Sequence, residues 1–168
     1  MSTLDSLLYQ WISRANEHLD DFALPIGLVE DSIDILTHVL GREYLEQLLI
    51  SESEPIHFLD GEANPIRKWL MSAMVDQHII QALELAAYFR AFENDAALRD
   101  KVQKLKYDKF WPVFFELAMA TRVKRACRAM QEVVLNPETT SSIGDFTLAS
   151  PAIAFRVSAL VWGAHPRF

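Results

Sequence analysis

The chain has 168 residues, of which 51% are hydrophobic and 23% charged, and its formal net charge at pH 7 is −7. This composition excludes a disordered or fibrous protein, and the length suffices for one core, or for one small domain beside a subdomain. The single cysteine, Cys127, excludes an internal disulfide and a cysteine-based zinc site, which favours a cytoplasmic protein.

The first fifty residues show the apolar spacing of amphipathic helices. Apolar side chains recur at i, i+3, i+4, i+7 and i+8 from the fourth residue, which predicts a helix capped by Ser2 or Thr3 that ends near Leu19. A second helical stretch is expected over residues 28–50. Gly41 is expected to bend or divide it.

Two further long helices are predicted before residue 131. Pro65 suits the first position of a helix with Asn64 as its N-cap, and the apolar pattern continues over residues 66–92. Asp95 then favours a break and the cap of a shorter helix. Residues 108–130 complete the helical part of the chain.

After residue 130 the pattern changes to short β-forming runs. These runs cover residues 133–135, 141–148 and 152–162. We therefore expect an α+β protein with a mainly helical N-terminal bundle, residues 1–107. Its C-terminal region, residues 108–168, is expected to be a helix followed by a small three-stranded sheet.

This last region carries acids at positions that suggest a family. Glu116 lies on the predicted helix, and Asp145 follows a glycine at the start of the second run. The order resembles the helix and first three strands of the PD-(D/E)XK nuclease core, over about residues 108–162. The resemblance implies that Glu116 and Asp145 are catalytic acids, because Mg²⁺ in nucleases prefers carboxylate oxygens.

The third strand departs from the family pattern. The family has an acid-x-Lys pair there, and this chain has Arg156, Val157 and Ser158. An arginine cannot bind Mg²⁺, and a serine hydroxyl does not replace an ammonium group. We therefore expect a degenerate nuclease-like region that binds without catalysis and has no metal site. The alternative is a metal-dependent nuclease of DNA or RNA that uses Mg²⁺ and takes its missing groups from elsewhere.

Charge is distributed unevenly along the chain. Residues 1–62 hold thirteen acidic and two basic side chains, whereas residues 99–128 hold nine basic and three acidic ones. The basic stretch predicts a nucleic-acid-binding surface. Its expected residues are Arg122, Lys124, Arg125 and Arg128. A solvated face, or docking on the acidic helices, is the other interpretation, because a pI near 5.2 is not typical of nucleic-acid binders.

Partners are expected to be macromolecules. A protein partner or homo-oligomer is favoured, nucleic acid is the other partner class, and a structural subunit or an acidic mimic that inhibits a nucleic-acid-binding protein is a further alternative. No glycine-rich phosphate loop is present, so no nucleotide cofactor is expected. No membrane span is expected either, because the most apolar window contains Pro151 and Arg156.

Two other groups of residues favour simple structural roles. The aromatic residues at helical spacing are interpreted as core or subunit interface. They are Trp69, Phe89, Phe92, Trp111, Phe114 and Phe115. Glu30, Asp34 and His38 share one helix face, which we interpret as solvated or ion-paired because no second helix offers matching metal ligands.

Overall fold

The structure is a computed structural model, which describes most of the helical part of the chain and three short strands. The described residues are 2–19, 24–51, 64–71, 76–107, 109–126, 132–135, 146–149 and 154–157. They fall into two compact units, Met1–Arg90 (unit 1) and Ala91–Phe168 (unit 2), which we describe separately. The sequence predicts a boundary after residue 107, and the compact units divide after residue 90.

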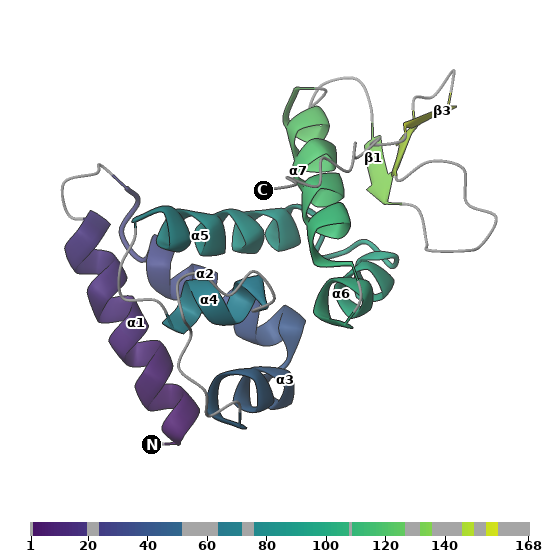
Figure 1. The fold of residues 1–168 in the computed structure, drawn as a ribbon. Helices are drawn as coiled ribbons and strands as arrows, with labels where there is room; N and C mark the ends of the chain where they lie inside the picture. The colour runs from purple at the N-terminus through teal and green to yellow at the C-terminus, as the bar shows by residue number, and fades with distance from the viewer. Residues whose placement is uncertain are drawn as a thin grey trace, which may run out of the picture. The chain divides into compact units, whose positions relative to one another are not determined.

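All the described elements of unit 1 are helical (Figure 1). In chain order it contains α1 (Thr3–Leu19), α2 (Leu28–Leu40), α3 (Arg42–Glu46), the π-helical turn η1 (Gln47–Ser51), α4 (Pro65–Met71) and α5 (Asp76–Ala91). The predicted first helix is confirmed. The helix expected over 66–92 is seen as α4 and α5, and residues 72–75 lie outside the described part of the chain.

The start of α1 is fixed by a capping box. The backbone N–H of Asp5 donates to Ser2 Oγ at 3.2 Å, and the N–H of Ser2 donates to Asp5 Oδ2 at 3.0 Å. This confirms the predicted cap at Ser2. The buried side chains of α1 lie three or four residues apart and so form one face. They are Leu4, Leu8, Trp11, Ala15 and Leu19.

A buried hydrogen bond joins α1 to α4. The indole Nε1–H of Trp11 donates to the backbone carbonyl of Trp69 at 3.1 Å, and both tryptophans are buried. Trp69 lies in the last turn of α4, where carbonyls have no partner within the helix. One contact therefore satisfies a buried donor and a helix-end acceptor, either of which would cost about 1–3 kcal/mol if left unpaired.

Two predicted helix boundaries are confirmed. Gly41 separates α2 from α3, and its φ of 86° lies in the left-handed region that glycine adopts readily. At the start of α4, Asn64 Oδ1 accepts the backbone N–H of Ile66 at 2.9 Å. Asn64 is therefore the cap, and Pro65 occupies the first helical position.

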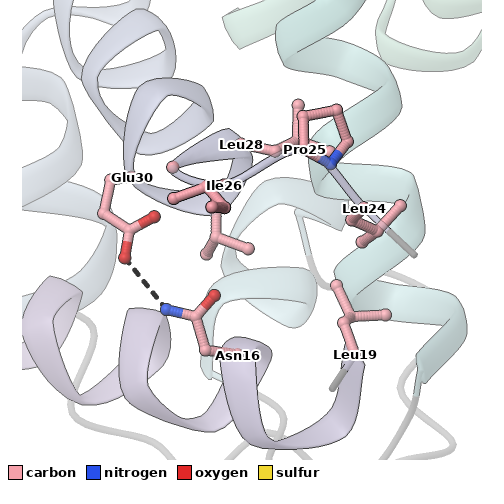
Figure 2. A pocket seen from close by; sticks show the side chains of 9 residues that line it. Asn16, Leu19, Leu24, Pro25, Ile26, Leu28 and Glu30 are labelled. Atoms are coloured by element: carbon pink, nitrogen blue, oxygen red, sulfur yellow. Dashed lines mark hydrogen bonds between the residues drawn. The ribbon is translucent and has the colours of Figure 1, made fainter. Parts of the chain in front are cut away.

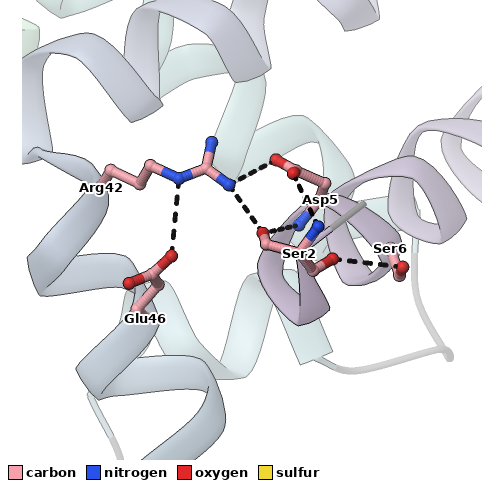
Figure 3. Close-up of polar contacts among 5 residues, drawn as sticks. All are labelled: Ser2, Asp5, Ser6, Arg42 and Glu46. Atoms are coloured by element: carbon pink, nitrogen blue, oxygen red, sulfur yellow. Dashed lines mark hydrogen bonds and ion pairs between the residues drawn. The ribbon is translucent and has the colours of Figure 1, made fainter.

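An exposed polar network joins α1 to α3 (Figure 3). Arg42 Nη2 donates to Asp5 Oδ1 at 2.6 Å and to Ser2 Oγ at 2.7 Å, while Arg42 Nε lies 3.4 Å from Glu46 Oε1. The hydrogen bond from Arg42, followed by those from Ser2, lowers the pKa of Asp5 from 3.8 to about 2. Arg42 therefore favours the ionised form of Asp5 in the folded protein.

The lowered pKa predicts an acid-dependent contribution to stability. Because the pKa of Asp5 is lower in the folded state, its contribution is complete above about pH 4 and is lost as the pH falls towards about 2. Asp5→Asn should therefore be less stable than the wild type at neutral pH, and this difference should shrink in acid. Urea unfolding at several pH values measures it, with the exposed Asp34→Asn as control. A difference that stays constant down to about pH 2 would contradict the assignment.

Unit 2 pairs two helices with three short strands (Figure 1). Its elements are α6 (Leu98–Tyr107), α7 (Phe110–Ala126), β1 (Glu132–Leu135), β2 (Phe146–Ala149) and β3 (Ala154–Val157). Helix α7 packs against α6 on one side and against β1. Strand β1 pairs antiparallel with β2, which pairs antiparallel with β3, so that Val133 lies opposite Leu148 and Thr147 opposite Arg156.

The expected α+β class is wrong, because the described chain is mainly helical. Each strand is four residues long, whereas α1 and α7 have 17 residues each. Where burial is described, most buried apolar side chains come from helices, and β1 adds Val133 and Leu135. No helix in the described ranges is long and apolar enough to cross a membrane.

Candidate functional site

The predicted catalytic acid Glu116 forms a buried ion pair. Lys101 Nζ of α6 lies 2.6 Å from Glu116 Oε1 of α7, and the side chains are only 2% and 5% exposed. This buried pair joins α6 to α7. A carboxylate that ligates Mg²⁺ in a nuclease must reach solvent and substrate, whereas this one is occupied by an ammonium group.

The other residues of the nuclease-like pattern are only partly described. Asp145, the second predicted catalytic acid, lies outside the described residues. Arg156 lies in β3 opposite Thr147, and Ser158 also falls outside the described part. Of the two predicted acids, only Glu116 is therefore described. That Glu116 and Asp145 lie close together stays a prediction.

The four predicted nucleic-acid-binding residues separate into three groups. Arg122 and Arg125 are exposed on α7, and within the described residues neither meets a carboxylate. Lys124 is half-buried, because its Nζ donates to the carbonyl of Ala91 and lies 4.7 Å from the ring centre of Phe92. It therefore has a structural role at the start of unit 2. Arg128 lies outside the described residues.

Large apolar side chains are exposed beside the two arginines. Trp111, Phe115 and Met119 are 44%, 46% and 42% exposed, and their spacing of four residues places them in one row on α7. Arg122 continues this row one turn further. We call Trp111, Phe115, Met119 and Arg122 the α7 stripe. Large exposed apolar patches with polar residues at their edge are typical of interaction sites.

The aromatic end of the α7 stripe is ordered by ring contacts. Trp111 and Phe115 stack with ring centres 5.9 Å apart and planes 28° apart, and Phe114 meets both rings edge to face. Aromatic pairs in these geometries contribute about 0.5–1.5 kcal/mol beyond their buried area. The exposed rings are thus held in place before any partner binds, which lowers the entropy lost on binding.

The spacing of the aromatic residues predicted the buried rings but not the exposed ones. The aromatic residues were interpreted as core or subunit interface. This interpretation is confirmed for four of them, which are buried in the core: Trp69, Phe89, Phe92 and Phe114. Trp111 and Phe115 are exposed instead. The sequence did contain a signal for this exposed surface. Helix α7 is apolar around most of its circumference, whereas packing against the rest of the protein needs only one helix face. The apolar residues at 111, 115 and 119 can therefore contact a partner.

Unit 1 contains a separate pocket between the end of α1 and the start of α2 (Figure 2). Its volume is about 400 Å³, within the range of about 300–1,000 Å³ that is typical of binding sites. Its apolar lining includes Leu19, Leu24 and Ile26, of which Leu24 and Ile26 are exposed. At its edge, Asn16 Nδ2 donates to Glu30 Oε1 at 2.9 Å.

Metal-ligating side chains do not gather in the described part of the chain. No three His, Cys, Asp or Glu side chains lie close enough there to hold an ion. Glu30, one member of the acid–histidine face on α2, accepts the amide of Asn16. In α5, burial and then the charge of Lys68 lower the pKa of His78, which favours its neutral form.

Comparison with known proteins adds no family to these observations. No family model, curated protein or solved structure matches the chain. The resemblance to the PD-(D/E)XK core therefore stays a prediction. The strongest candidate for a functional surface is the α7 stripe, because its exposure and its chemistry come directly from the described residues.

Proposed function

We propose that this chain is a non-catalytic macromolecule-binding protein and that the α7 stripe is its binding surface. A degenerate nuclease-like ancestry of residues 108–162 is part of the proposal. The observation that carries it is the exposure of Trp111, Phe115 and Met119 in one row that ends at Arg122. Tryptophan, phenylalanine, methionine and arginine are the residues enriched where proteins bind other macromolecules.

The absence of catalysis is supported by the Lys101–Glu116 pair. A nuclease that used Glu116 would have to break a 2.6 Å ion pair between two buried side chains before metal could bind. Removing one partner of such a pair leaves an uncompensated buried charge. The metal-dependent nuclease alternative is therefore less favoured than binding, since its first acid already stabilises the α6–α7 hairpin.

The charge of unit 2 favours an acidic partner. Unit 2 contains eleven basic and eight acidic residues, whereas unit 1 contains five basic and fifteen acidic ones. Arg122 lies at the end of the stripe and Arg125 on the neighbouring surface, and both are exposed. An acidic macromolecule would meet apolar contacts along the stripe and cations at its end. Such complementarity speeds association and selects the partner.

Two probes test the proposal on the purified full chain. One is a fluorescent single-stranded 20-mer oligonucleotide, and the other is a fluorescently labelled sample of the protein itself. We expect the protein to bind at least one of them and to leave a supercoiled plasmid intact in the presence of Mg²⁺ or Mn²⁺. Failure to bind either probe at low salt would overturn the binding function. Plasmid cleavage that a Glu116→Gln variant loses would overturn the non-catalytic one.

A further inference from the structure

The composition of the α7 stripe distinguishes a protein partner from a nucleic acid. Three of its four residues are apolar, and only Arg122 and the nearby Arg125 offer exposed cations on α7 that meet no carboxylate within the described residues. A surface that follows a phosphate backbone needs a row of cations, because binding strength grows with each phosphate neutralised. An apolar row with an arginine at its end is instead typical of the centre and rim of a protein interface.

A matching partner must combine exposed apolar side chains with an acidic edge. Trp111, Phe115 and Met119 need apolar side chains that remove them from water, and Arg122 needs a carboxylate beside it. The partner surface must also be accessible in the folded protein. These requirements can be compared directly with the pocket in unit 1.

The rim of the unit 1 pocket combines exposed apolar side chains with an acidic edge (Figure 2). Leu24 and Ile26 are exposed at its mouth, and Leu19 lines it from α1. Glu30 lies at its edge, and Asn16 holds Glu30 Oε1 by a hydrogen bond of 2.9 Å. Within the described residues the second oxygen, Oε2, has no hydrogen-bond partner and is available to a guanidinium. Asp34, one turn further along α2, is exposed and adds negative charge.

We infer that the partner is a second copy of this chain, whose unit 1 pocket receives the α7 stripe of the first copy. The inference rests on the proposed binding function and names its partner. The two surfaces differ, so the contact is head-to-tail: each copy offers one pocket and one stripe. Such a contact joins successive copies into open chains or closed rings. The acidic unit 1 and the basic unit 2 then meet at the contact between copies.

Two variants with reversed or added charge test the stripe and the pocket separately. The stripe variant is Met119→Glu/Arg122→Glu, and the pocket variant is Ile26→Lys/Glu30→Lys. All four side chains are exposed, so both variants should fold, and their melting temperatures check this. Each variant loses one surface and keeps the other. Each should therefore associate at least about 30-fold more weakly, the change expected for loss of an interface hot spot.

Sedimentation velocity over a concentration series gives the decisive comparison. The wild type should grow in mass from the 19.2 kDa monomer, and each variant alone should stay monomeric. An equimolar mixture of the two variants should form a heterodimer and nothing larger, because only one intact stripe–pocket contact can form per pair. No symmetric contact of stripe with stripe produces this complementation.

Other outcomes overturn the inference and distinguish its failure from that of the proposed function. A wild type that stays monomeric but binds the 20-mer in a stripe-dependent way would remove the second copy and retain the binding function. If the pocket variant associates as strongly as the wild type, the pocket is not the surface that receives the stripe. The binding function would be retained, and the stripe would bind a different surface. A monomer that also fails to bind the 20-mer would overturn both.

Discussion

Glu116→Ala is expected to lower the free energy of unfolding by about 3–5 kcal/mol, because it removes one partner of a buried ion pair. Lys101→Ala should have an effect of similar size. Both side chains are almost fully buried and only 2.6 Å apart, so solvent does not screen the loss. Chemical denaturation of the single variants measures the effect.

The double variant Lys101→Met/Glu116→Leu provides the informative comparison. Replacing a buried ion pair by apolar side chains of similar volume is often neutral or stabilising, so this variant should be far more stable than either single variant. Together with the single variants Lys101→Met and Glu116→Leu it closes a cycle, in which the change in the double variant minus the sum of the two single changes is the coupling free energy of the pair. The exposed pair of Arg90 and Asp31, 3.6 Å apart, is a matched control that should couple by less than about 1 kcal/mol.

The opposite result would change the interpretation of Glu116. Functional acids are often retained at a cost in stability, so that their removal stabilises the protein. If Glu116→Ala leaves stability unchanged or raises it, the carboxylate is kept for chemistry and the nuclease alternative gains support. Near-additive losses in the double variant would contradict the ion pair itself.

Asp95→Ala is expected to cost about 2–4 kcal/mol, because one carboxylate accepts two backbone hydrogen bonds. Asp95 Oδ1 accepts the N–H of Ala97 at 2.9 Å, in the turn that leads into α6. Asp95 Oδ2 accepts the N–H of Leu135 at 2.8 Å, at the end of β1. Asp95 therefore connects α6 to a strand that is forty residues away in sequence.

Amide hydrogen exchange separates the two roles of Asp95. In Asp95→Ala the amide of Leu135 should exchange faster, because it loses its acceptor. Asp100→Ala, which removes an exposed acid from the first turn of α6, is the control and should leave that amide unchanged. Unchanged protection of Leu135 in Asp95→Ala would show that the strand does not depend on this carboxylate.

Local signals in the sequence predicted the helix boundaries well. Ser2, Gly41 and Asn64 act within a few residues of their own positions, through a cap, a left-handed φ and a second cap. Asp95 was expected to break and cap a helix, and its contact with Ala97 confirms this. Its contact with Leu135 could not be predicted, because it depends on the tertiary fold.

Local β-propensity overestimated the contribution of the C-terminal strands to the fold. β-forming residues after Met130 predicted an α+β class, and the strands that the structure describes there are four residues long. The propensity of a short run measures how well it fits a half-buried sheet surface and not how large the sheet becomes. The helical core, which the apolar spacing did predict, determines the class.

The candidate surface depended on which face of α7 the fold covers. Glu116 and Trp111 lie on the same helix, one among its buried and one among its exposed residues. Sequence periodicity gave no preference between two apolar faces of one helix. Only packing of α7 against α6 and β1 separates the buried face that stabilises unit 2 from the exposed face that carries the α7 stripe.

The most direct test of the account measures one variant in one binding assay. Trp111→Ala/Phe115→Ala is compared with Tyr9→Ala, which removes a more exposed aromatic ring from α1, using whichever probe the wild type binds. We expect at least about a tenfold loss of affinity for the first variant and none for the second. Unchanged affinity of a folded Trp111→Ala/Phe115→Ala protein would contradict the assignment of the α7 stripe as the binding surface.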